Sequence, residues 1–246
     1  MSDFPAASEH SDPVEVFPDV WLIRGTLIGE QRTITRNMVV LRDGAELTLV
    51  NSVRLSSAGE ARLADLGRVT HLVKLGAFHG LDDPYYRSRY PVRFWAPPGS
   101  THKGDIAHDR ELTEDSMPPL PGLSVFRFRN TRLPEAALLL PAGGGTLITC
   151  DAVTNVIDLE GTRGMERIYS RENGFLRPAS IGLFWRNGMA REDGPSLIQD
   201  YQRLLDLDFR NLITGHGPPL LGSARDDVRE SVRVAFGVRR WPARVQ

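Results

Sequence analysis

Three segments that lie far apart in the sequence each end an apolar run on a residue that can bind a metal or transfer a proton. Two of them are Leu147-Ile-Thr-Cys-Asp151 and Leu212-Ile-Thr-Gly-His216, and the third runs through residues 69–79 to His79, followed by Asp82 and Asp83. In layered α/β proteins, catalytic and binding residues concentrate where strands pass into loops. Because His and Asp side chains are common metal ligands, three strand ends that deliver them together predict a metal site.

His79, Asp151 and His216 are the better candidates, as metal ligands and as catalytic residues, with Asp82 and Asp83 in reserve. Three protein ligands and an open position make a mononuclear site, whereas a binuclear hydrolytic centre needs about five or six ligands, mostly imidazoles. The sequence does not supply that larger set. The expected cofactor is therefore one divalent ion (zinc, iron or manganese), and the alternative is that no metal is bound.

Each of these candidates also has a structural interpretation. His79 at a strand-to-loop junction also suits a helix cap or a loop contact, and Asp151 also suits a turn held by its carboxylate. His216 lies between Gly215 and Gly217 on a constrained loop, which favours a role in the site.

Lys74 belongs to an otherwise apolar strand, where a buried ammonium group would need a partner. In one interpretation Lys74 turns into the cleft, where it pairs with Asp151 or takes the place of a lost metal, which makes it a candidate catalytic residue. In the other, which a strand with one solvated face favours, Lys74 points to solvent.

The remaining titratable residues favour structural roles. His71 in the middle of an apolar strand predicts a structural histidine with a hydrogen-bonded ring. Cys150 has no basic partner nearby in the sequence, so we expect a buried apolar neighbour rather than a nucleophile. His102 and His108 fall in a polar loop, where solvated surface is expected.

Composition narrows the class of protein. The chain has 246 residues, 41% of them hydrophobic, and a formal net charge of -1, which gives no case for nucleic acid or an anionic membrane as partner. A single cysteine excludes an intrachain disulfide and a thiolate zinc cluster. No apolar leader and no stretch of ~20 apolar residues occurs. We expect a cytoplasmic protein that acts on a small-molecule ligand or substrate, with homo-oligomerisation left open.

The pattern of elements predicts a layered α/β domain over residues 13–246, preceded by a disordered tail at residues 1–12. Asp43-Gly44 joins two β runs and is a strong hairpin signal. Residues 56–66 follow the helix rules, with Ser56 or Ser57 as N-cap. Residues 152–194 are the least regular part. The other predicted strands are 14–25, 69–75, 92–96, 123–128, 136–140, 146–149 and 212–214, and the other helices are 83–89, 196–207 and 224–236.

The order of these pieces, across roughly residues 14–236, resembles the metallo-β-lactamase superfamily, whose fold is an αββα sandwich with a metal site along one edge of its two sheets. The segment Thr149-Cys150-Asp151-Ala152 resembles the family's Gly-Asp-Ala/Leu element. Thr214-Gly215-His216-Gly217 resembles its final Gly-His element. Residues 69–73 match the strand that leads into its His-x-His-x-Asp-His signature.

The signature itself is degenerate. Aligned without a gap, its metal-binding positions fall on Gly76, Phe78, Gly80 and Leu81, and only a shifted alignment brings His79 and Asp82 or Asp83 to the site. The family's middle histidine is replaced by the run at 132–135, Arg-Leu-Pro-Glu. The chain therefore resembles a divergent branch with a truncated metal signature.

This resemblance implies a hydrolase-like protein with a reduced, mononuclear metal site, acting on a small ester, lactone, amide or phosphoester. The alternative is a non-catalytic, metal-free member of the fold that binds a ligand or a partner. A third interpretation is a metal-free hydrolase that uses Lys74 or His79 together with a carboxylate.

Overall fold

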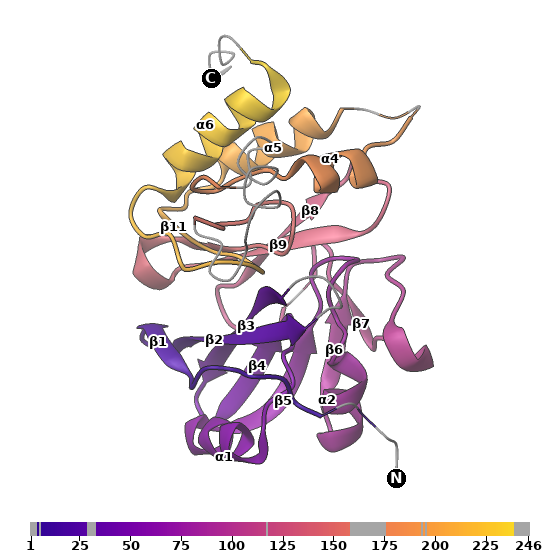
Figure 1. Ribbon diagram of the computed structural model, residues 1–246, viewed down its shortest axis with the longest axis vertical. Helices are drawn as coiled ribbons and strands as arrows, with labels where there is room; N and C mark the ends of the chain where they lie inside the picture. Colours follow the sequence, from indigo (N-terminus) through magenta and orange to yellow (C-terminus); the bar gives the residue numbers. More distant parts are fainter. Residues whose placement is uncertain are drawn as a thin grey trace.

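Two β-sheets pack face to face, and helices cover the outer face of each sheet, as Figure 1 shows for this computed structural model. The structure describes residues 4, 6–28, 33–116, 118–157, 176–192, 194 and 196–238. The predicted fold class, an α/β layered sandwich of the αββα type, is confirmed. No helix within these described ranges is long and apolar enough to cross a membrane.

The first sheet has seven strands in chain order. The pairs from β1 to β4 are antiparallel, and those from β4 to β7 are parallel. Its strands are β1 (Val14–Phe17), β2 (Val20–Ile28), β3 (Thr33–Asp43), β4 (Glu46–Val50), β5 (Arg68–Val73), β6 (Arg93–Ala96) and β7 (Arg110–Glu111).

The second sheet has four strands in the order β11-β10-β9-β8. Only the β10–β11 pair is parallel, and this pair carries two of the candidate site residues beyond its ends. The strands are β8 (Ser124–Phe128), β9 (Glu135–Leu140), β10 (Thr146–Ile148) and β11 (Asn211–Ile213).

The helices divide between the two sheets. The first sheet is covered by α1 (Ser57–Leu66) and α2 (Asp83–Arg89), and the second by α4 (Leu183–Met189), α5 (Leu197–Asp206) and α6 (Ala224–Phe236). Two short 3-10 turns, η1 (Lys103–Asp105) and η2 (Ala142–Gly144), lie in connecting loops.

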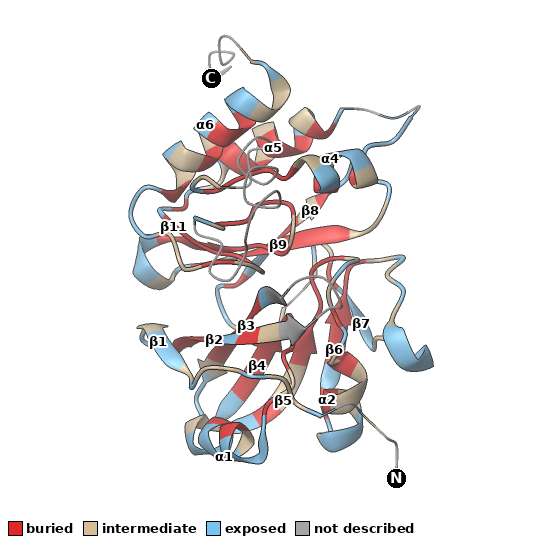
Figure 2. Cartoon of the chain, in the orientation of Figure 1, coloured by how far each residue is buried: buried red, intermediate tan, exposed pale blue. Residues whose placement is uncertain are grey.

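Strand β3 shows how alternation builds the layers. Val39 and Leu41 point into the cluster between the two sheets, while Met38 and Val40 point to the cluster under α1 and α2. A third cluster joins the second sheet to α5 and α6. Figure 2 shows the buried residues along the strands and on the helix faces turned toward them. The core thus consists of three apolar layers that hold the sheets in place.

Local sequence signals account for much of this framework. The hairpin predicted at Asp43-Gly44 joins β3 and β4, and Gly44 has the positive φ of 58° that such a turn requires. Ser56 is the N-cap of α1, where its hydroxyl accepts a hydrogen bond from the Gly59 N–H at 3.2 Å. Helices α2 and α6 begin and end close to their predicted bounds.

Residues 9–12, the end of the predicted disordered tail, make hydrogen bonds to the rest of the chain. The Ser11 N–H donates to the Arg24 carbonyl, and the Thr26 N–H donates to the Glu9 carbonyl. The ring of His10 accepts from the Ser56 N–H at 2.8 Å. These bonds attach residues 9–12 to β2 and to the start of α1. The helix α4 falls inside the segment at 152–194 that the sequence left irregular, and part of that segment lies outside the described residues.

Candidate metal centre

The parallel pairing of β10 with β11 places Asp151 beside His216. Ile148 is directly opposite Ile213 in the register, and Asp151 and His216 each lie three residues beyond these partners. Both strands are fully buried, so their ends have a fixed position at the edge of the sheet. As a result His216 Nε2 lies 3.0 Å from Asp151 Oδ1.

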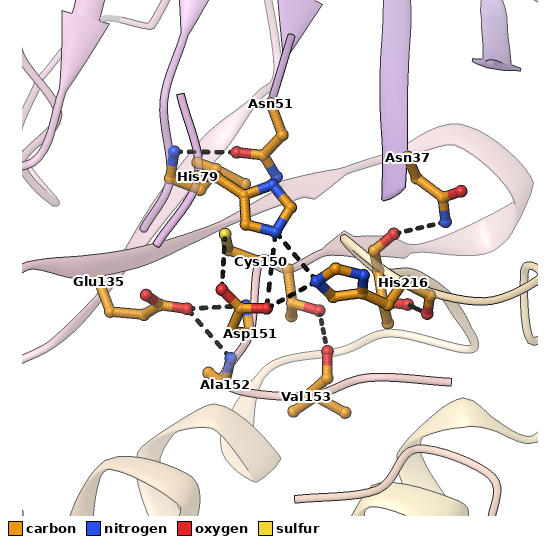
Figure 3. A network of polar contacts seen from close by, with 12 residues as sticks. Asn37, Asn51, His79, Glu135, Cys150, Asp151, Ala152, Val153 and His216 are labelled. Carbon is orange, nitrogen blue, oxygen red and sulfur yellow. Dashed lines mark hydrogen bonds and ion pairs between the residues drawn. The ribbon is translucent and has the colours of Figure 1, made fainter. Parts of the chain in front are cut away.

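The third member of the group, His79, comes from the first sheet. It follows β5 through a turn in which the His79 N–H donates to the Gly76 carbonyl. Its Nε2 lies 3.2 Å from His216 Nε2 and 3.5 Å from Asp151 Oδ1. Figure 3 shows the two rings and the carboxylate converging on one point between the sheets. Among the described residues this is the one group of three or more His, Cys, Asp or Glu side chains close enough to share an ion.

The spacing of the three ligand atoms fits tetrahedral coordination. Bonds of about 2.0–2.1 Å to a tetrahedral Zn²⁺ require ligand atoms about 3.3 Å apart. The measured separations are 3.0, 3.2 and 3.5 Å. The residues therefore fit a single divalent ion held by three protein ligands.

The orientation of the His216 ring is fixed by strand β3. Nδ1 of His216 lies 2.6 Å from the Thr35 carbonyl oxygen, which can only accept, so Nδ1 carries the hydrogen and donates it. Nε2 then faces the site, where it carries a proton toward Asp151 in the metal-free protein and would give up that proton to bind an ion; supporting contacts enforce this ring orientation at metal-binding histidines. The Asn37 side chain secures the same loop by donating to the carbonyls of Thr214 and Gly217.

Gly215 allows the His79 ring to approach. A Cβ atom at this position would lie 3.0 Å from Cε1 and 3.1 Å from Nε2 of that ring. A side chain at this position would require the His79 ring to shift by a few tenths of an ångström. The glycine of the Thr-Gly-His run therefore has a steric function in the candidate site.

The electrostatics of the group favour an ionised carboxylate. Burial acts to raise the pKa of Asp151, but the charges and hydrogen bonds of His79 and His216 outweigh it, so the pKa is lowered overall. Burial acts to lower the pKa of His216, and the hydrogen bond and charge of Asp151 outweigh it in turn, so this pKa is raised. In the absence of metal, Asp151 and His216 therefore stabilise each other as a charged pair.

Glu135 is a part of the site that the sequence analysis missed. Its side chain is only 1% exposed, and Oε1 accepts from the Asp151 N–H at 3.1 Å and from the Ala152 N–H at 3.0 Å. Burial, followed by the negative charge of Asp151, raises the pKa of Glu135 well above its usual value. The sequence feature that could have indicated this role is an acidic residue at the first position of an otherwise apolar strand, β9.

Asp82, a predicted ligand, takes a different position. Its Oδ2 accepts from Arg36 Nη2 at 2.5 Å and from the Arg54 N–H at 2.8 Å, and Asp82 is not part of the metal-capable group among the described residues. The ion pair with Arg36 of β3 therefore already engages the Asp82 carboxylate. The reserve candidate Asp83 is buried and accepts from the Ser52 hydroxyl at 2.6 Å.

Lys74 does not point to solvent, and this expectation is corrected. It is 2% exposed, and its Nζ donates to the Thr101 carbonyl at 2.7 Å. Burial lowers the pKa of Lys74, partly opposed by the charge of Asp83. Among the described residues it forms no ion pair with Asp151. The ammonium group thus stabilises the loop at residue 101 instead of entering the metal site.

The structure confirms the predicted environment of some histidines and of the cysteine outside the site, and differs from it for others. The His71 ring accepts from the Trp95 indole at 3.0 Å, as expected of a structural histidine. Cys150 is fully buried, and burial raises the pKa of its thiol well above the usual value. His102 and His108 are half-buried, not fully solvated, and their rings are joined by a hydrogen bond of 2.9 Å.

Comparison with known proteins gives a fold but no closer relative. No protein-family model and no curated protein matches the sequence. Solved structures of metallo-β-lactamases do match. The mono-zinc form of FIM-1 from Pseudomonas aeruginosa is 13% identical, with 94% of this chain and 98% of that chain covered and a TM-score of 0.62.

Two further structures give the same result. The enzyme from Erythrobacter litoralis is 15% identical, with 96% of each chain covered and a TM-score of 0.60. The enzyme from Hirschia baltica is 12% identical, with 91% of this chain and 96% of that chain covered and a TM-score of 0.60. The chain therefore has the metallo-β-lactamase fold, in agreement with the resemblance seen in the order of its elements.

Proposed function

We propose that the protein is a hydrolase of the metallo-β-lactamase fold that binds one divalent ion through His79, Asp151 and His216. The observation that carries this proposal is the set of three ligand separations, which match tetrahedral coordination. FIM-1, a protein of the same fold, has been solved in a mono-zinc form, so this fold can hold a single zinc. Zinc is accordingly the first ion to test, before iron and manganese.

A bound divalent ion would supply Lewis-acid chemistry, which polarises a substrate oxygen and makes water more acidic. The protein residues supply geometry and charge. Asp151 would contribute one negative charge, His216 is oriented by Thr35, and a set of three protein ligands would leave a fourth coordination position for water or substrate. The ester, lactone, amide and phosphoester classes all suit this chemistry.

A second candidate is a metal-free protein of the same fold that binds a ligand or a partner. The favouring observation is that Asp151 and His216 already form a pair at 3.0 Å that needs no ion. Phe78 and Leu81, which occupy two signature positions, are 58% and 42% exposed and suit contact with an apolar ligand. The Lys74-based hydrolase finds no support, since this side chain is bound to Thr101.

Elemental analysis separates the two candidates. Protein produced in medium supplemented with zinc, iron and manganese is expected to contain about one equivalent of one of these metals. The Asp151→Ala and His216→Ala variants are expected to lose it. Metal at background level in the unchanged protein, with a melting temperature that chelators do not alter, would support the metal-free candidate instead.

A further inference from the structure

We infer that Glu135 is a positioning residue for the candidate metal centre, because its carboxyl group fixes the backbone that presents Asp151 to the two imidazoles. This inference rests on the proposed metal site. It assigns to Glu135 a supporting function, with no direct contact to the ion or to the substrate.

The contact that carries the inference is a double hydrogen bond. Oε1 of Glu135 accepts from two successive backbone N–H groups, those of Asp151 and Ala152, at 3.1 and 3.0 Å (Figure 3). Two bonds to adjacent amides fix both the position and the direction of this turn. The Asp151 carboxylate can therefore hold Oδ1 toward His79 and His216 before an ion arrives, and such preorganisation strengthens binding.

Glu135 also contacts the segment that carries His79. It forms an isolated antiparallel bridge with Gly76, and the Ala136 N–H donates to the Leu75 carbonyl at 2.8 Å. A Cβ atom at Gly76 would lie 2.3 Å from Oε2 of Glu135, so the acid fills space that a side chain at Gly76 would need. Glu135 thus lies between the turn that ends in His79 and the turn that carries Asp151.

The cost of this arrangement argues against a purely stabilising role. Oε2 of Glu135 is buried and has no hydrogen-bond partner among the described residues. Trp185 lies close enough to act on the carboxyl group, but no hydrogen bond of standard geometry joins the two. An unpaired buried oxygen next to the Asp151 carboxylate lowers the stability of the fold, so stability alone does not account for an acid at this position.

Asp200 on α5 provides a matched control. It is also fully buried and also accepts from two successive backbone N–H groups, those of Arg129 and Asn130, at 3.0 and 2.7 Å. In addition it pairs with Arg203 at 2.9 Å, so both of its oxygens are satisfied. Asp200 supports a turn beyond β8 that carries no candidate ligand.

The experiment compares Zn²⁺ affinity, measured by competition with a chromophoric chelator, and the visible spectrum of the Co²⁺-loaded protein. Glu135→Ala is expected to weaken Zn²⁺ binding about 10–100-fold, the usual effect of removing a supporting contact, and to change the Co²⁺ spectrum. Glu135→Gln keeps an oxygen acceptor for the two amides and is expected to stay within about 3-fold of the unchanged protein. Asp200→Ala is expected to lower the melting temperature with unchanged Zn²⁺ affinity.

Equal affinity in the Glu135→Ala and unchanged proteins would overturn the inference while leaving the metal site intact. Equal losses in the Glu135→Ala and Asp200→Ala variants would also overturn it, because the effect would then be general destabilisation. Hydrogen exchange at the Asp151 and Ala152 amides of the metal-free protein gives a readout independent of metal binding. Faster exchange in Glu135→Ala, restored by Gln, supports the positioning role, and unchanged exchange refutes it.

Discussion

Two pairs of histidines in this protein have nearly the same ring geometry and different surroundings. His79 and His216 have ring centroids 5.0 Å apart at an interplanar angle of 66°, and His102 and His108 have centroids 5.2 Å apart at the same angle. The first pair has the Asp151 carboxylate within 3.5 Å of both rings. In the described residues the second pair belongs to no group of three potential ligands.

The electrostatic consequences are opposite. Asp151 raises the pKa of His216 against the effect of burial. Burial lowers the pKa of His102 to about 4, and the positive charge of Lys74 adds to this shift. Two close imidazoles therefore do not make a metal site by themselves. In the proposed site the carboxylate would supply the third ligand and the negative charge that a cation needs.

The largest expected effect comes from removing that carboxylate. Asp151→Asn is expected to weaken Zn²⁺ binding by more than about 100-fold, because even residues that merely support ligands are worth about 10–100-fold. Competition with a chelator of known affinity measures the change. Retained affinity in this variant would show that the two imidazoles suffice, and the distinction between the two pairs would be lost.

A substitution in the second pair is expected to affect stability and not zinc binding. His102→Gln removes the hydrogen bond to His108 and is expected to lower the free energy of unfolding by about 1 kcal/mol. Its Zn²⁺ affinity is expected to remain within about 2-fold of the unchanged protein. Urea unfolding and metal titration of the same sample test both statements. A marked loss of bound zinc in this variant would place the ion at His102 and His108 and would contradict the proposed site.

The two pairs are also expected to give opposite pH dependence in the metal-free protein. For His102 the folded-state pKa is about 4, below the unfolded value, so the folded state binds fewer protons and stability falls as the pH drops from about 6.5 toward 4. For His216 the folded-state pKa is raised, so its contribution is fully present below about pH 6.5 and is lost as the pH rises through the raised value.

Urea unfolding across pH 4–8 tests this assignment. His102→Gln is expected to flatten the decline between about pH 6.5 and 4, and His216→Gln to remove the contribution lost above about pH 6.5. If both substitutions changed the pH profile in the same direction, the opposite charge environments inferred for the two pairs would be contradicted.

The smallest effect concerns Lys74, the cation next to the second pair. Its charge lowers the pKa of His102, so Lys74→Met is expected to raise that pKa while the pKa of His216 stays constant. NMR titration of the histidine ring signals measures both values in one sample. An unchanged pKa of His102 would leave burial and the charge of His108 as the causes of its shift.

Much of the framework is predictable because local chemistry specifies it. The Asp43-Gly44 turn, the Ser56 cap and the short apolar runs before Asp151 and His216 each depend on neighbours in the sequence. The meeting of His79 with the other two residues depends on the packing of two sheets. The three strand endings and the family resemblance both indicated it, although no local contact in the sequence specifies it.

The features that the sequence did not predict have a common physical cause. Burial of Lys74, the ion pair of Asp82 with Arg36 and the role of Glu135 all depend on partners that are distant in the sequence. A single sequence shows an acid or a lysine beside an apolar run, but not which backbone groups it will meet. The attachment of residues 9–12 to β2 was missed for the same reason, since its hydrogen bonds use backbone groups that composition does not reveal.

The most direct test is a crystal structure of the protein grown with Zn²⁺, with anomalous scattering recorded at the zinc edge. The account predicts one ion, about 2.0–2.2 Å from Nε2 of His79, Nε2 of His216 and Oδ1 of Asp151. An ion between His102 and His108, or no anomalous peak near Asp151 at saturating zinc, would contradict it.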